Sequence, residues 1–135
     1  MSRLVLALLP LLAACATQPA PPSRIAGDWR FVSIDGDAPA VPDRARLSFA
    51  DDRINASVGC NAMAGPWRIE EGRLIAGPLA GTRMYCEGPV WSQEDALSAL
   101  LVAAPTIAFE DEQLVLKSSG HSAALARVSP PRSGS

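Results

Sequence analysis

The chain has 135 residues, of which 48% are hydrophobic, and its 12 basic and 14 acidic residues give a net charge of −2. This length fits one domain with a packed core, and the hydrophobic content excludes a largely disordered chain. The lack of a basic excess argues against nucleic acid as a partner, because a nucleic-acid-binding protein normally carries a clustered basic face.

The first fifteen residues, MSRLVLALLPLLAAC, have the pattern of a bacterial lipoprotein signal peptide. Arg3 supplies a short positive region, and Leu4 to Leu12 form an apolar run that is too short to span a bilayer. The run Leu12-Ala13-Ala14-Cys15 resembles the lipobox, at which signal peptidase II cleaves before a diacylated cysteine. We therefore expect residues 1–14 to be removed and Cys15 to carry lipid. The alternative is an ordinary signal peptide with a chance cysteine.

A lipid on Cys15 predicts anchoring to a membrane of the bacterial cell envelope. Each buried acyl methylene contributes ~0.8 kcal/mol, so several acyl chains hold a protein firmly on the bilayer. Ala16 stands where an aspartate would resemble an inner-membrane retention signal, which favours the outer membrane, with the domain facing the periplasm. Residues 16–24, ATQPAPPSR, are rich in proline and polar residues, so the segment 15–24 is predicted to be an extended tether.

After the tether, alternating polar and apolar residues predict short β-strands. The first strand covers 28–34, with Trp29, Phe31 and Ser33 on one face, and a proline-containing loop follows over 35–43. Two hairpins come next, one pairing 44–50 with 53–58 and the other pairing 67–69 with 73–76. Residues 79–85 then lead as a further strand to Cys86.

The periodicity changes after Gly88-Pro89. Residues 90–104, VWSQEDALSALLVAA, predict a helix with Ser92 as a candidate N-cap and with acidic residues in its first turns, and Pro105 ends it. A third hairpin over 106–109 and 114–117 and a last strand over 123–128 complete the pattern. The tail 129–135, SPPRSGS, is predicted to be disordered.

These elements predict an α+β fold, namely an antiparallel β meander of about eight short strands that curls into a half-barrel, with one α-helix packed on it. We expect Trp91, Leu97 and Leu101 of the helix to fill the barrel. If they did not, the interior could hold an acyl chain. Seven apolar strand residues would line it: Leu47, Phe49, Ile54, Val58, Leu74, Leu114 and Leu116.

Cys60 and Cys86 remain once Cys15 is assigned to the lipid. Paired thiols outside the cytoplasm tend to oxidise, so a Cys60–Cys86 disulfide is the leading interpretation. Two free buried thiols are a second interpretation, and a catalytic or metal-bound cysteine is a third. The third is disfavoured because a structural zinc site needs four ligands, and because His121, the single histidine, lies in a turn typical of solvated surface.

Two stretches, GCNAMAGPW at 59–67 and GPLAGTRMYC at 77–86, resemble the META domain of HslJ-like heat-shock proteins. The resemblance covers about 25–128 and implies an antiparallel α+β fold linked to envelope stress or secretion, without a known reaction. It departs at Tyr85, where relatives commonly have a small residue or methionine, and at Trp67, where they often have tyrosine. The matching residues are Gly59, Cys60, Asn61, Gly65, Trp67, Thr82, Arg83, Met84 and Cys86.

The residues therefore favour a non-enzymatic envelope lipoprotein that binds a partner. They show no nucleophile–base or acid–base arrangement, so no catalytic residue, cofactor or metal is assigned. The motif residues around Thr82, Arg83 and Met84 form the candidate binding surface for an unknown envelope protein or lipid ligand. The alternative is a pilotin-like protein or a carrier of lipid or hydrophobic peptide, and a hydrolase is the third hypothesis.

Overall fold

The fold is known from a computed structural model, which describes residues 17–129. The predicted signal peptide, the lipidation site Cys15 and residues 130–135 of the predicted tail lie outside the described residues. The elements in chain order are β1 (Gln18–Pro19), α1 (Pro22–Ile25), β2 (Gly27–Ile34), the 3₁₀ turn η1 (Pro42–Arg44), β3 (Arg46–Phe49), β4 (Ile54–Ser57), β5 (Ala62–Gly65), β6 (Trp67–Glu70), β7 (Arg73–Ala76), β8 (Ala80–Gly81), α2 (Pro89–Val102), β9 (Thr106–Glu110), β10 (Gln113–Lys117) and β11 (Ser122–Arg127).

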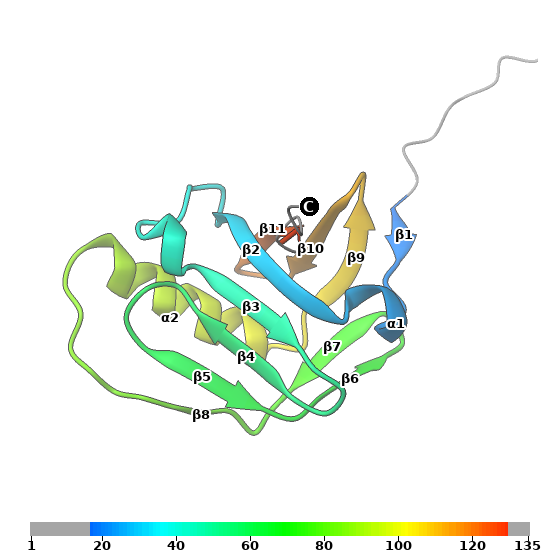
Figure 1. The fold of residues 1–135 in the computed structure, drawn as a ribbon, viewed down its shortest axis with the longest axis horizontal. Coiled ribbons are helices and arrows are strands. Elements are labelled where there is room, and N and C mark those ends of the chain that lie inside the picture. Colours follow the sequence, from blue (N-terminus) through cyan, green and yellow to red (C-terminus); the bar gives the residue numbers. More distant parts are fainter. Residues whose placement is uncertain (1–16, 130–135) are drawn as a thin grey trace, which may run out of the picture.

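All the strands belong to one curled antiparallel sheet, in the order β6-β7-β9-β10-β11-β2-β3-β4-β5-β8, with β1 added beside β9 (Figure 1). Two meanders, β2 to β5 and β9 to β11, meet where β11 pairs with β2. The predicted α+β half-barrel is therefore confirmed. Its strands are more numerous than predicted, because β1 and β5 were not expected, and β8 covers only two residues of the strand predicted over 79–85.

The predicted inward faces are correct for β3 and β4, where alternate residues from 45 to 49 and from 54 to 58 are buried. β2 differs at one position. Trp29 and Phe31 are buried, but Ile34 follows them into the core in place of Ser33. A β-bulge explains the change, because Val32 is left out of the register between β2 and β11 and the chain changes face there.

Helix α2 lies against the curled sheet (Figure 1). Its residues Leu97, Leu100 and Leu101 are at most 1% exposed and belong to the core. The helix begins at Pro89 with Gly88 as its N-cap, so the predicted cap at Ser92 is wrong. Trp91 was expected in the core and is instead 41% exposed. Trp91 lies six residues before Leu97. This spacing corresponds to a rotation of about 240° around the helix axis, so Trp91 lies on a different side of α2 from Leu97.

The interior of the half-barrel is packed rather than hollow at the positions that the carrier hypothesis requires. All seven strand residues predicted to line it are buried, and they share one core with the leucines of α2. The described structure therefore gives no support to an acyl chain held inside the curl.

Part of the predicted tether is packed on the domain. β1 pairs with β9, and the fully buried Ile25 at the end of α1 accepts a 2.8 Å hydrogen bond from Nε1 of Trp29. The guanidinium of Arg24 lies 4.2 Å from the ring centroid of Phe109. The extended tether predicted over 16–24 thus needs correction from residue 18 onward. Within residues 17–129, no helix is both long and apolar enough to cross a bilayer.

Candidate functional site

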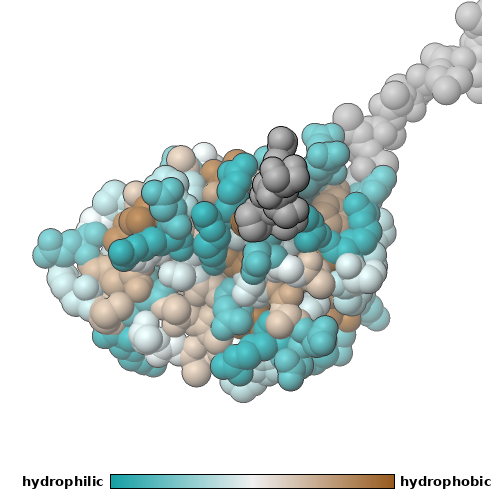
Figure 2. Space-filling view, viewed as in Figure 1, coloured by the Kyte–Doolittle hydropathy of each residue, from teal (hydrophilic) through white to brown (hydrophobic). Residues whose placement is uncertain are grey.

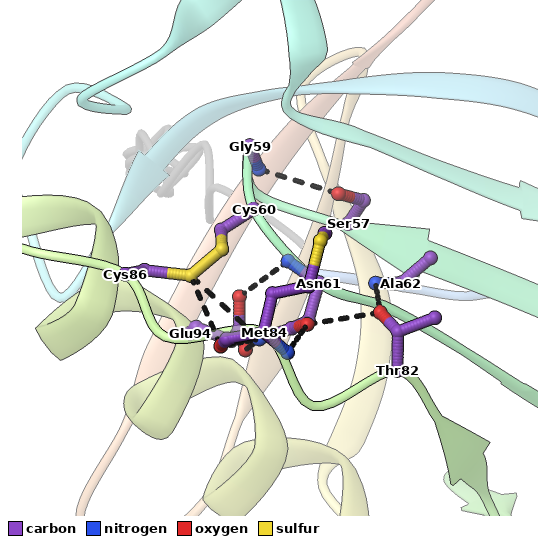
Figure 3. The surroundings of a disulfide bond; sticks show 9 residues. All are labelled: Ser57, Gly59, Cys60, Asn61, Ala62, Thr82, Met84, Cys86 and Glu94. Carbon is purple, nitrogen blue, oxygen red and sulfur yellow. Dashed lines mark hydrogen bonds between the residues drawn. A yellow bond between two sulfur atoms is a disulfide. The ribbon is translucent and has the colours of Figure 1, made fainter.

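The two motif stretches meet beside the start of α2 (Figure 3). Cys60 in the turn after β4 and Cys86 just before α2 form a disulfide, with their Cα atoms 6.3 Å apart. The leading interpretation of the two cysteines therefore agrees with the structure. Glu94 completes a group of three metal-ligating residue types there, but the disulfide removes the two thiolates that such a metal site would need.

Asn61 is the buried polar centre of this region, with 5% of its surface exposed. Its Oδ1 accepts hydrogen bonds from the backbone N of Met84 at 2.7 Å and from Oγ1 of Thr82 at 2.9 Å. Its Nδ2 donates to the backbone O of Met84 at 2.9 Å. The side-chain amide thus pairs with both backbone groups of Met84, as a neighbouring strand would, and holds the segment 82–86 in place.

Glu94 of α2 ties the helix to the same turn. One carboxylate oxygen accepts a 2.6 Å hydrogen bond from Nδ2 of Asn61, and the other accepts a 2.9 Å bond from the backbone N of Asn61. Glu94 was predicted only as an acidic residue near the helix start. Its partner lies 33 residues away in sequence, so spacing alone could not indicate the pair.

The two motif glycines have packing roles. Gly59 has a φ of +136°, and a Cβ there would lie 2.8 Å from the Cβ of Val41. At Gly65, a Cβ would lie 2.4 Å from the backbone O of Pro78. Both positions exclude side chains because the neighbouring chain is too close, so neither glycine needs a ligand to explain it.

We expect Gly65→Ala to lower the free energy of unfolding by about 1–3 kcal/mol, since the added methyl group meets a backbone carbonyl that cannot rotate away. Urea denaturation followed by tryptophan fluorescence measures the change. Gly120→Ala is the matched control, because its Cβ would meet no atom within 4 Å. Equal stability of the two variants would contradict this account of Gly65.

Trp67 lies apart from the other motif residues that were expected to form a surface. Its ring packs edge-on against Phe49 with the centroids 4.8 Å apart, and its Nε1 donates a 2.7 Å hydrogen bond to the backbone O of Ala50. Trp67 is therefore a packing residue of β6.

An exposed surface, which we call the motif-loop surface, consists of Arg83, Met84, Tyr85 and Trp91. Met84 is 57% and Tyr85 80% exposed, and the rings of Tyr85 and Trp91 lie 5.7 Å apart. Figure 2 shows one face of the molecule, on which small hydrophobic areas are interspersed with hydrophilic residues. A cavity of about 380 Å³ opens at the motif-loop surface, lined by Asn61, Thr82, Arg83, Met84, Tyr85, Trp91 and Glu94.

The sequence model of the META domain family matches residues 23–130, which include every motif residue described above. The chain belongs to the META domain family. This span agrees with the 25–128 expected from the sequence. In this META domain protein, the site residues surround Asn61 and the disulfide. Trp91, which was predicted in the core, lies at the surface of this site.

Two solved structures share the fold of this META domain. One is an NMR structure of a protein that is 22% identical, with a TM-score of 0.69, covering 79% of this chain and 94% of the other. The second is an NMR structure of a protein from Burkholderia xenovorans that is 24% identical, with a TM-score of 0.64, covering 93% of this chain and 100% of the other. The comparison with curated proteins finds no match.

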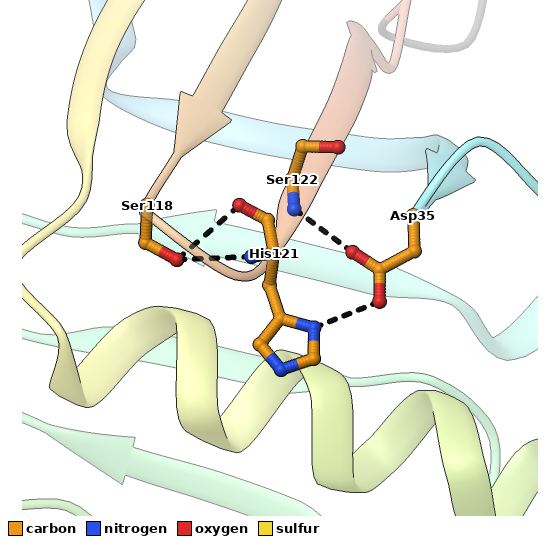
Figure 4. A network of polar contacts seen from close by, with 4 residues as sticks. All are labelled: Asp35, Ser118, His121 and Ser122. Atoms are coloured by element: carbon orange, nitrogen blue, oxygen red, sulfur yellow. Dashed lines mark hydrogen bonds and ion pairs between the residues drawn. The ribbon is translucent and has the colours of Figure 1, made fainter.

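His121 of the META domain lies in the turn between β10 and β11 and pairs with Asp35, the first residue after β2 (Figure 4). Its Nδ1 is 2.8 Å from Oδ2 of Asp35, and the backbone N of Ser122 donates to Oδ1 at 2.9 Å. The His121 hydrogen bond, and then that of Ser122, lower the pKa of Asp35. Ser118 bonds the backbone of His121 and not its ring, so these residues lack the hydroxyl–imidazole contact of a catalytic triad.

Proposed function

We propose that this META domain protein is a lipid-anchored, non-enzymatic binding protein of the bacterial cell envelope, and that the motif-loop surface receives its partner. The observation that carries the proposal is the arrangement around Asn61. Its buried amide, together with the disulfide, presents an exposed loop rather than a reactive group. A binding role linked to envelope stress or secretion is in keeping with such a surface.

The exposed side chains suit recognition of another molecule. Tyrosine and tryptophan supply large contact areas and are enriched at the residues that dominate binding energy. The loop that carries Tyr85 is held by the hydrogen bonds to Met84 and by the disulfide at Cys86. A surface that is already ordered loses less conformational entropy on binding, which favours affinity.

The envelope location rests on the lipobox at Leu12 to Cys15. Lipid on Cys15 would attach the domain to the membrane, and Ala16 favours the outer membrane facing the periplasm. An oxidising compartment is also where a Cys60–Cys86 disulfide persists. The anchor and the disulfide thus point to the same side of the inner membrane.

We expect Cys15→Ala to release the protein from the membrane into the soluble periplasm or the medium. The acyl chains account for the membrane affinity of the processed protein in this proposal. Fractionation followed by immunoblotting measures the shift, with Cys60→Ala as a control that keeps the anchor. A Cys15→Ala protein that has lost residues 1–14 and still stays in the membrane fraction would contradict lipid anchoring.

Site-specific photocrosslinking in living cells tests the binding surface. A photoreactive phenylalanine analogue in place of Tyr85 is expected to form a discrete adduct with an envelope protein. The same analogue in place of Glu112, an exposed residue of the β9–β10 turn, serves as the matched control and is expected to form none. Identical adduct patterns at the two positions, or no adduct at Tyr85, would overturn the proposed surface.

A further inference from the structure

We infer that the partner of the motif-loop surface is an extended peptide segment, which pairs with residues 82–86 as an added β-strand. This inference rests on the proposed function and specifies the chemical class of the partner. It follows from the backbone geometry of the loop and not from its exposed side chains alone.

The segment 82–86 continues the edge of the sheet beyond β8. Among the described strands, β8 pairs with β5 alone. Directly after it, the backbone N of Thr82 donates a 3.0 Å hydrogen bond to the backbone O of Ala62. Two residues later, both backbone groups of Met84 are bound by the Asn61 amide. The inward backbone groups therefore recur at every second residue, as they do in a strand.

The intervening backbone groups, those of Arg83 and Tyr85, consequently point away from the sheet. Among the hydrogen bonds of residues 17–129, none involves the backbone N or O of either residue. Such a row of unpaired groups is a template for strand addition, in which main-chain hydrogen bonds supply much of the affinity.

The opposite edge of the sheet is protected in a way that this one is not. β6 follows Pro66 and carries an Arg68–Glu70 ion pair at 2.8 Å, and both proline and charge discourage strand pairing. Residues 82–86, TRMYC, contain no proline and one charge. The difference favours 82–86 as the edge that accepts a partner.

The side chains define the composition of the peptide. Arg83 is exposed and forms no ion pair within the described part of the chain, so an acidic residue of the peptide would complement it. Tyr85 and Trp91 offer an aromatic contact for an apolar residue. The expected partner therefore has alternating apolar residues and at least one acidic residue.

The experiment selects ten-residue peptides from a displayed random library against the full-length protein in detergent and then scans the best binder by N-methylation of single amides. Strand addition predicts that methylating every second amide weakens binding at least tenfold, while methylating the intervening amides changes it less than twofold. Binding that shows no such alternation, or a selection that yields no binder dependent on the motif-loop surface, would overturn the inference.

Two variants at one position test the protein side. Tyr85→Ala removes the ring and keeps the backbone N–H, whereas Tyr85→Pro removes both, so we expect Tyr85→Pro to bind the peptide at least tenfold more weakly than Tyr85→Ala. Equal affinities would oppose strand addition. If Tyr85→Pro does not fold, the N-methyl scan decides alone. A photocrosslinked adduct at Tyr85 without N-methyl alternation would support the proposed function but contradict strand addition. Binding of an acyl chain at this surface would have the same meaning.

Discussion

Asn61→Ala is expected to lower the free energy of unfolding by about 2–4 kcal/mol. The substitution removes the side-chain partner of one Glu94 carboxylate oxygen and of both backbone groups of Met84. The backbone N of residue 61 still donates to the other oxygen of Glu94. A fully buried polar group left unsatisfied costs about 1–3 kcal/mol. These hydrogen bonds are only partly buried, so water offsets part of the sum. Urea denaturation at neutral pH measures the difference between the variant and the wild type.

Asn55→Ala provides the matched control for this prediction. Asn55 lies on β4, only a few residues before Asn61, but it is exposed, so its removal is expected to change stability by no more than about 0.5 kcal/mol. Loss of Asn61 is also expected to abolish the photocrosslink at Tyr85, because the loop is no longer held. A stable Asn61→Ala variant with an unchanged crosslink would show that the amide does not organise the site.

Removing the disulfide is expected to cost roughly 3–4 kcal/mol. The bridge closes a loop of about 27 residues, and this is the chain-entropy estimate for a loop of that length. Cys60→Ser and Cys86→Ser should destabilise to similar degrees, and the double variant hardly more than either single one, because each removes the same bond. Urea denaturation under oxidising conditions gives the three values.

A reducing agent supplies the control for the disulfide prediction. It should lower the wild-type protein to the level of the serine variants and leave the double variant unchanged. Losses that add in the double variant would mean that the two cysteines contribute independently, which would support the alternative of two free thiols.

Local patterns in the sequence were sufficient for most of the fold. Alternation identified the inward faces of β3 and β4, because their apolar residues contrast with polar neighbours at every second position. The helix was also recognisable, since Leu97, Leu100 and Leu101 recur on one side. The assignment of Cys15 to lipid left Cys60 and Cys86 as a pair, and the predicted compartment was then enough to favour their disulfide.

Other features were missed because their causes are not local. β5 consists of Ala-Met-Ala-Gly, which lacks the β-branched residues that indicate a strand, and it forms through pairing with β4 and β8. The proline-rich composition of the segment before residue 25 is typical of a tether. Its residues Gln18 and Pro19 nevertheless pair with β9, which the composition does not indicate.

The candidate site could be predicted only in part. The motif residues Asn61, Thr82 and Met84 were recognised by resemblance, and the structure shows them in direct contact. Glu94 could not be added, since its contact with Asn61 depends on how α2 docks against the turn. Trp91 was predicted in the core with the leucines of the helix, but its six-residue spacing from Leu97 places it on another face.

If Asn61 holds residues 82–86 as the edge of a sheet, alternate backbone groups of this segment are available to a partner. Residue-resolved amide hydrogen exchange by NMR measures this pattern in the free protein. We expect the Met84 amide to be protected and the amides of Arg83 and Tyr85 to exchange rapidly. Equal exchange at all three positions, or protection of Arg83 and Tyr85 with a fast Met84, would contradict it.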